Sequence, residues 1–76
     1  MKELVAFLAK SLVDHPDEVN VSQVEGEKSI ILELSVAPSD MGKVIGKQGR
    51  IAKALRTIVK AATPRGGKSV HLEIVD

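Results

Sequence analysis

Cysteine, tryptophan and tyrosine are absent from this sequence, and Phe7 is its only aromatic residue. Without cysteine the chain has neither disulfide bonds nor thiolate metal sites. With a single ring it cannot bind nucleic acid by stacking successive bases on an aromatic platform, as many binding modules do. Any contact that it makes with a base must therefore be aliphatic, polar or through the main chain.

Long apolar stretches are also missing, so no segment approaches the roughly 20 residues that a bilayer span requires. Residues 1–4 include an acidic side chain and lack the basic region and cleavage site of a signal peptide, which predicts a cytoplasmic protein with no membrane partner. The 76 residues are interpreted as one domain, 1–76. Because so small a core rarely supplies more than about 3–5 kcal/mol, a partner chain is expected.

Acidic residues are missing from one long part of the chain, residues 41–68. This segment has eight Lys and Arg and no Asp or Glu, whereas residues 1–40 have eight acidic residues and three lysines. The net charge of the whole chain is only +1, so its positive charge is concentrated in one segment. Such a concentration is typical of a surface that attracts an anionic partner, but a solvated, lysine-rich helix face would have the same composition.

Hydrophobic periodicity predicts an α+β domain in the order helix, strand, strand, helix, loop, helix, strand. A polar turn at residues 25–28 joins the first two strands as a hairpin. The last strand follows two helices, so it is expected to lie parallel to the strand before them through a right-handed crossover. The prediction is a three-stranded mixed sheet with the helices on one face. The expected elements span 2–14, 18–25, 29–37, 41–45, 50–62 and 69–75.

Apolar spacing also predicts which faces of the helices are buried. The first helix has an apolar face at Leu4, Val5, Leu8 and Leu12. Helix 50–62 has an apolar face formed by Ile51, Leu55, Ile58 and Ala62, which lie within about 60° of one another around the helix axis. The favoured interpretation of so wide a stripe is packing on the sheet, and the alternative is that part of it packs on a second subunit. Ser39 or Asp40 is expected to cap the short helix, and Gly42 is expected to permit close helix packing.

The segment Gly46-Lys47-Gln48-Gly49 places two glycines three residues apart between two predicted helices. Glycine has no Cβ, so a sugar–phosphate chain can approach the backbone closely. The N–H groups that open the following helix are unpaired, and the helix dipole favours an anion there. Lys47 and Arg50 add positive charge. The segment therefore predicts a loop that binds backbone phosphate.

Other phosphate and nucleic-acid motifs fit less well. A P-loop needs one more residue between Gly42 and Gly46 and a Ser or Thr where Gln48 stands. A dinucleotide fingerprint lacks its first glycine pair. A DNA-binding helix-turn-helix is disfavoured because helix 41–45 is very short.

Catalysis has little support in the sequence. His15 lies before a proline, and His71 is expected to face away from the core. No nucleophile–base pair or paired carboxylates stand out, so we expect no enzyme and no cofactor. Asp14, His15 and Asp17 can be interpreted as a metal site or as a polar turn, of which the turn is the favoured interpretation.

Residues 44–51, Val-Ile-Gly-Lys-Gln-Gly-Arg-Ile, resemble the signature of KH domains, and the element order resembles their type II arrangement. Together with residues 12–17 and 36–53, this extends the resemblance over essentially the whole chain, to the stand-alone KH proteins of bacteria. It implies binding of single-stranded RNA, with about four nucleotides held at the loop. It further implies an RNA chaperone or post-transcriptional regulator that acts as a homodimer or with KhpB, a larger Jag-type RNA-binding protein. Links to cell elongation, cell shape, cell wall biogenesis and envelope homeostasis are implied by the resemblance alone.

Carried over to this sequence, the resemblance places phosphates at the loop 46–49. One wall of the groove is expected from apolar residues beside the loop, and the other from strand 69–75 with loop 63–68. The expected RNA-binding residues are Gly46, Lys47, Gln48, Gly49, Lys43, Val44, Ile45, Arg50, Ile51, Lys53, Arg65 and Lys68. The alternative interpretation is a dimerisation module whose RNA binding is supplied mainly by its partner.

Overall fold

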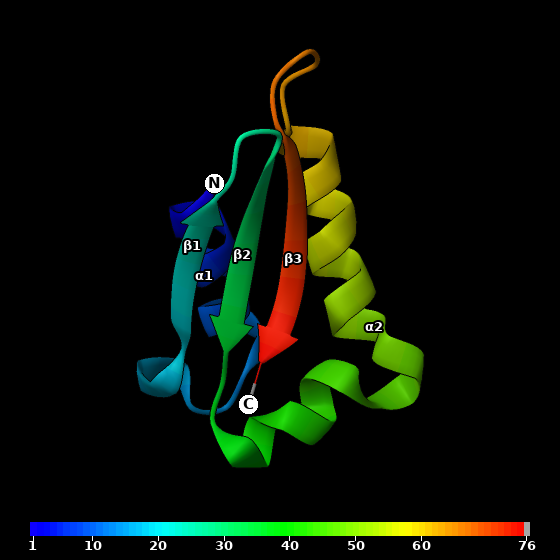
Figure 1. Ribbon diagram of the computed structural model, residues 1–76. Helices are drawn as coiled ribbons and strands as arrows, with labels where there is room; N and C mark the ends of the chain where they lie inside the picture. Colours follow the sequence, from blue (N-terminus) through cyan, green and yellow to red (C-terminus); the bar gives the residue numbers. More distant parts are fainter. Residues whose placement is uncertain (76) are drawn as a thin grey trace.

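The computed structural model describes residues 1–75 and has the predicted α+β architecture (Figure 1). Strand β1 pairs antiparallel with β2, and β2 pairs parallel with β3, in the order β1-β2-β3. The mixed sheet and the crossover through two helical segments are therefore confirmed. The elements are α1 (Lys2–Leu12), a 3₁₀ turn η1 (Pro16–Glu18), β1 (Asn20–Glu25), β2 (Ser29–Ser35), α2 (Pro38–Ala62) and β3 (Ser69–Val75).

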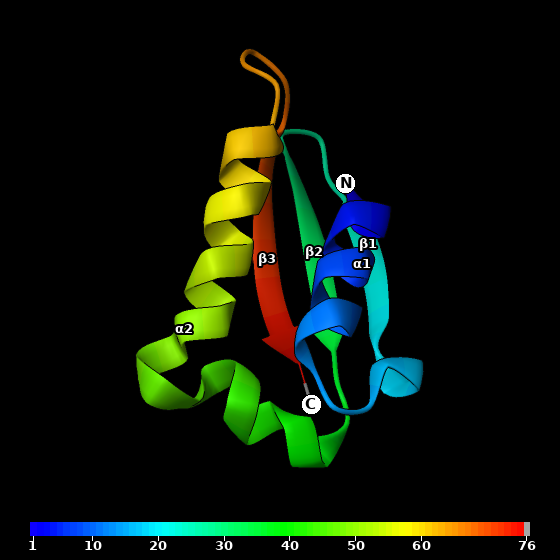
Figure 2. The ribbon, with the colours of Figure 1, turned by 180° about the vertical axis from the view of Figure 1, so that it is seen from behind.

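Both helices cover one face of the sheet (Figure 2). α1 packs on β1, and the later half of α2 runs along β3. The strands alternate as predicted, so that Leu32 and Leu34 of β2 are fully buried beneath the helices. Leu72 of β3 lies beside Leu32 in the sheet and is also buried. Each such side chain removed from water stabilises the fold by about 1.5–3 kcal/mol.

The helices meet the sheet through smaller side chains than the sequence analysis predicts. α1 buries Val5 and Ala9, while Leu4 and Leu12 are exposed. The later half of α2 buries Ala52, Leu55 and Val59, while Ile58 and Ala62 are exposed. The predicted faces were therefore only partly right. Alanine at the contact lets a helix lie close to the sheet, whereas a prediction from apolar spacing favours the large side chains.

Several predicted ends are shifted. The first helix ends at Leu12, before the expected residue 14, and η1 occupies the start of the expected strand 18–25. The second strand ends at Ser35, and α2 begins at Pro38, three residues earlier than expected. Proline is well placed there, because the first N–H of a helix has no intrahelical partner.

The predicted capping of α2 is wrong. Ala37 occupies the cap position and makes no side-chain hydrogen bond, while Ser39 and Asp40 lie inside the first turn. Asp40 is buried there and accepts hydrogen bonds from a distant turn. The carboxylate therefore serves a tertiary contact instead of the helix terminus.

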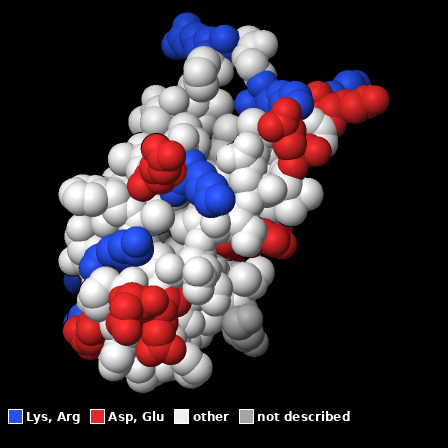
Figure 3. All heavy atoms as spheres, turned by 90° about the vertical axis from the view of Figure 1, so that its left-hand side faces the viewer, with Lys and Arg blue, Asp and Glu red and all other residues white. Residues whose placement is uncertain are grey.

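The surface over α1 and β1 carries both signs of charge (Figure 3). Acidic side chains gather toward its lower end, where α1 leads into η1, and Asp14, Asp17 and Glu18 are exposed in that segment. Within residues 1–75, no helix is long and apolar enough to cross a membrane. Lys43 of α2 lies against this acidic segment, whereas Arg56 and Lys60 lie farther along α2, beside β3.

Candidate nucleic-acid interface

Residues 46–49 break α2 into two helical segments. Gly46 is extended, with φ −72° and ψ 174°, and the next three residues are left-handed, with φ of 50°, 63° and 71°. The first segment, 38–45, therefore runs across the end of the sheet, and the second, 50–62, runs along β3 (Figure 1). The loop lies at the corner between them.

The backbone of this loop is strained. Lys47 and Gln48 have side chains and yet adopt positive φ, which costs an L residue roughly 1–2 kcal/mol. Such outliers concentrate at binding and catalytic sites, where surrounding structure holds them. The strain is therefore consistent with a loop shaped for a ligand.

The two glycines of the loop have different roles. Gly49 has φ +71°, a conformation that favours glycine. Gly46 has an ordinary φ of −72°, and a Cβ built on it would meet nothing within 4 Å. The fold therefore does not require glycine at 46, and the missing Cβ leaves room for a ligand to approach the backbone. A Cβ on Gly42 would also meet nothing within 4 Å, so the expected close packing at Gly42 is wrong.

A shallow hollow of about 300 Å³ lies against the loop, and Lys47, Gln48, Arg50 and Lys53 line it. Three of these four side chains are cationic, and all four are exposed. The N–H groups that open the second helical segment add a partial positive charge at the same place. This geometry suits a backbone phosphate.

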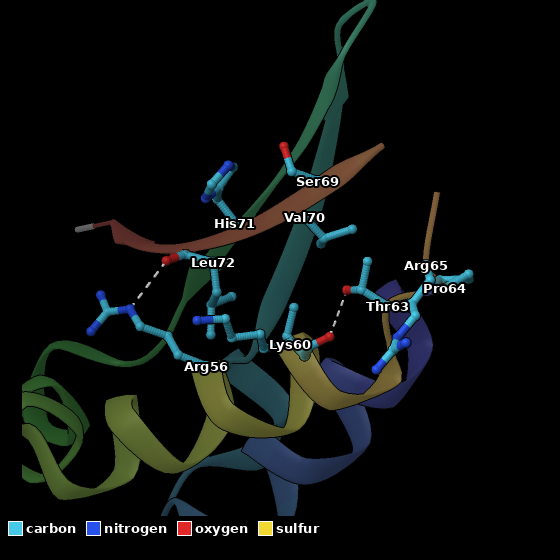
Figure 4. Close-up of a pocket in the computed structure, with 10 residues that line it drawn as sticks. Arg56, Lys60, Thr63, Pro64, Arg65, Ser69, Val70, His71 and Leu72 are labelled. Atoms are coloured by element: carbon cyan, nitrogen blue, oxygen red, sulfur yellow. Dashed lines mark hydrogen bonds between the residues drawn. The ribbon is translucent and has the colours of Figure 1, made fainter. Parts of the chain in front are cut away.

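A larger hollow of about 500 Å³ lies between the later half of α2, β3 and loop 63–68 (Figure 4). A neighbouring hollow of about 540 Å³ continues along β3 and shares Arg56, His71 and Leu72 with it. Together they form a groove beside β3, which we call the α2–β3 groove. Its cationic lining consists of Arg56, Lys60 and Arg65.

The edge of β3 facing this groove carries main-chain polar groups. β3 is the outer strand of the sheet, so one of its sides has no strand partner. Arg56 Nε donates a hydrogen bond to the carbonyl oxygen of Leu72 at 3.4 Å, which shows that this carbonyl faces the groove. The N–H and C=O of one strand residue point to the same side, so the N–H of Leu72 faces the groove as well. A main-chain donor and acceptor are thus available for the edge of a base.

Four of the six predicted basic residues line a hollow, namely Lys47, Arg50 and Lys53 at the loop and Arg65 in the α2–β3 groove, and the other two form ion pairs. Lys43 Nζ lies 3.2 Å from Asp14 Oδ1. Lys68 Nζ lies 2.7 Å from Glu25 Oε2 and does not line either groove hollow. The hydrogen bond and charge of Lys68 hold the pKa of Glu25 below its ordinary value.

The apolar residues expected beside the loop are not equivalent. Val44 is 1% exposed and belongs to the core, so it supports the loop from beneath. Ile51 is half-buried, and Ile45 is 54% exposed next to Gly46. Only Ile45 therefore offers a large apolar surface to a ligand at the loop.

Most residues that line the groove are absent from the predicted list, among them Arg56, Lys60, His71 and Leu72. The sequence does indicate Arg56 and Lys60, because they repeat with Lys53 at helical spacing on one face. The strand as a whole was expected to form a wall, but which of its residues faces the groove depends on register. Alternation separates the two faces of the strand but does not show which main-chain groups lie at its outer edge.

Comparisons with known proteins agree with this geometry. The family model of the KhpA/KhpB KH domain matches residues 2–74. The chain is 68% identical over 75 residues to the RNA-binding protein KhpA of Clostridium acetobutylicum, covering 99% of this chain and 100% of that protein. It is 54% identical over 76 residues to the RNA-binding protein KhpA of Aquifex aeolicus, covering 100% of this chain and 96% of that protein. No solved structure matches the chain.

A family match of this extent, together with the strained Gly-Lys-Gln-Gly loop between two helical segments, establishes the relationship. The chain belongs to the KhpA/KhpB family of KH domains.

Proposed function

We propose that the protein binds single-stranded RNA, with the phosphates at residues 46–49 and the bases in the α2–β3 groove. The observation that carries this proposal is the strained, cationic loop at the start of helix 50–62, together with a groove beside the same helix whose other wall is the outer strand β3. Relatives named as RNA-binding proteins at up to 68% identity support it.

Each part of the groove has a distinct chemical task in this proposal. Lys47, Arg50 and Lys53 neutralise successive phosphates, and the N–H groups opening helix 50–62 donate to one of them. The main chain of β3 at Leu72 meets base edges, while the half-buried Val70 offers aliphatic contact. A duplex has its base edges already paired, so single strands are expected to bind more tightly.

The test is fluorescence anisotropy of a short, labelled single-stranded RNA at low salt. The variant is Lys47→Asp, Gln48→Asp, which changes the charge of the loop without touching the core. A matched control is Lys10→Asp, Asn20→Asp, which makes the same change in net charge at exposed positions of α1 and β1. Circular dichroism checks that each variant is folded.

Loss of binding by the loop variant alone would support the proposal. Equal loss in the control would mean that net charge, not the loop, determines affinity. Wild-type affinity in the loop variant would contradict the proposal, as would equal affinity for a perfect RNA duplex.

Several finer functions rest on the family resemblance, and we propose them on that basis. They are an RNA chaperone or post-transcriptional regulator in the cytoplasm, linked to cell elongation and envelope homeostasis, which binds without catalysis. Its working unit is a homodimer or a complex with KhpB.

Exposed apolar side chains on both helices support such an assembly. Phe7 is 67% exposed, and Leu4 and Ile58 are exposed as well. Covering such side chains with a second apolar surface is favourable. Sedimentation velocity of wild type, Phe7→Asp and Ile58→Asp would test this. If the wild type is a monomer at all concentrations, alone and with KhpB, the proposed assembly is contradicted. The interpretation of the chain as mainly a dimerisation module then loses its support as well.

A further inference from the structure

Asp40 is the one charged residue buried in the core among residues 1–75, and its side chain is hydrogen-bonded to a distant turn. Its Oδ1 accepts from the backbone N–H of Asp14 at 3.1 Å, and its Oδ2 accepts from that of His15 at 2.9 Å. The Nδ1 atom of His15 lies 3.3 Å from the same Oδ2. The carboxylate thus satisfies two main-chain donors with separate oxygens.

These bonds join two segments that are far apart in the sequence. One is the turn that follows α1, and the other is the first turn of α2. The contact is reinforced on both sides, since Lys43 Nζ lies 3.2 Å from Asp14 Oδ1 and Ser39 Oγ lies 3.4 Å from His15 Nδ1. Asp40 is the buried centre of this contact, because the reinforcing pairs are exposed.

The helical segment 38–45 depends on such anchoring. A helix of about two turns is not stable by itself. Val44 secures it in the core, and Met41 is partly buried beside it. Asp40 and Val44 are four residues apart, so they lie on the same face of the helix in successive turns. Val44 and Met41 hold the segment to the core, and Asp40 adds a polar tie to the turn after α1 that fixes its tilt.

The direction of this segment determines where the loop lies, because Gly46 follows its last residue. Burial raises the pKa of Asp40, but the hydrogen bonds from Asp14 and His15 outweigh burial and hold it below the ordinary value. The side chain is therefore an ionised acceptor at neutral pH. An ionised acceptor binds N–H groups more strongly than a neutral one does.

We propose that Asp40 is a positioning residue for the loop at 46–49, holding segment 38–45 at the tilt that aligns Lys47 and Gln48 with the α2–β3 groove. This proposal rests on the proposed RNA binding. Asp40 does not touch the RNA in it. The Asp40 carboxylate acts on the loop indirectly, through the backbone of segment 38–45, and lies about two helical turns before the loop.

The test compares Asp40→Asn with the wild type at a temperature where both are folded. Asparagine keeps the shape but turns an NH₂ group toward one of the two donors. Affinity for a labelled single-stranded RNA is measured by anisotropy, and the backbone amide shifts of residues 46–49 are measured by NMR without RNA. Two controls accompany it. Asp17→Asn makes the same charge change at an exposed position, and Val5→Ala destabilises the core within α1.

We expect Asp40→Asn to bind RNA about tenfold more weakly and to shift the loop amides, while Asp17→Asn does neither. Val5→Ala should lower thermal stability without changing affinity. Wild-type amide shifts of the loop in Asp40→Asn would overturn the proposal. Equally weakened RNA binding in Val5→Ala would overturn it too, because stability alone would then explain the loss of affinity. If the wild type binds no RNA, the proposed function fails, but the loop shifts still decide whether Asp40 positions the loop.

Discussion

Arg56 and Leu72 connect the two walls of the groove, because the Arg56 guanidinium donates to the Leu72 carbonyl oxygen across 3.4 Å. The bond is long for an N–H···O contact. A weak hydrogen bond therefore holds the Arg56 side chain over the groove. A guanidinium has five donors, and within residues 1–75 one of those of Arg56 is used, so the others can meet a phosphate.

Arg56→Ala should weaken RNA binding and reduce its dependence on salt. Each neutralised phosphate contributes about 0.7 to the slope of log affinity against log salt for a single strand. The expected result is a slope smaller by about that amount, measured by anisotropy over a series of salt concentrations. Arg56→Lys should recover the slope but not the full affinity, because lysine lacks the planar fork.

The exposed α1 variant Lys10→Ala is the matched control for Arg56→Ala. It should leave both affinity and slope unchanged. Equal slopes for wild type and Arg56→Ala would mean that Arg56 makes no phosphate contact.

Gly46→Ala and Gly49→Ala should separate ligand access from backbone strain. The site of a Cβ at Gly46 is open, so Gly46→Ala should leave the free energy of unfolding nearly unchanged and weaken RNA binding. Gly49→Ala places a side chain at φ +71° and should destabilise the fold by about 1–2 kcal/mol. Urea denaturation and anisotropy measure the two effects. Unchanged RNA affinity in Gly46→Ala would show that RNA does not approach the chain there.

Gln48→Gly should stabilise the protein. Gln48 has φ 63°, and glycine adopts this conformation without the steric cost that an L side chain meets. Part of the gain is offset by the greater freedom of glycine in the unfolded chain, so we expect an increase of about 0.5–1 kcal/mol in the free energy of unfolding. The exposed substitution Gln23→Gly in β1 is the control and should be destabilising. A loss of stability in Gln48→Gly would show that the loop backbone is not strained in solution.

Acid should remove the stabilisation that Asp40 provides. Its pKa in the folded protein is below the ordinary 3.8, so the ionised form favours the folded state. That contribution is complete above the unfolded-state pKa and is lost as the pH falls from about 4 through the lower folded value. Urea denaturation of wild type and Asp40→Asn as a function of pH measures it. The stability gap between them should narrow below about pH 4, and a constant gap would contradict this origin.

The topology of the fold was predictable because it follows from order and alternation. Leu32, Leu34 and Val36 alternate with the polar Glu33 and Ser35, and two helices between parallel strands leave one plausible crossover. The helix faces were less predictable. Ala9 and Ala52 contact the sheet because they are small, and spacing alone does not distinguish a close contact from an exposed methyl group.

The loop itself was recognisable from the sequence, but the supports around it were not. Glycine spacing and the acid-free segment indicate residues 46–49. Asp40 looked like a helix cap, because its bonds to Asp14 and His15 exist only after α1 and α2 have packed together. Lys68 looked like a groove residue, yet it pairs with Glu25 across a turn whose position depends on the whole sheet.

Residues 47–49 all adopt the left-handed backbone conformation that D residues prefer. An L side chain at Gly49 is strained by the sign of φ and not by lack of room, since a Cβ there meets nothing within 4 Å. Its mirror image prefers this region for the same steric reason that L residues avoid it. A chain synthesised with D-alanine at 49 would therefore keep the turn, stiffen it, and distinguish handedness from side-chain volume as the reason why glycine occupies this position.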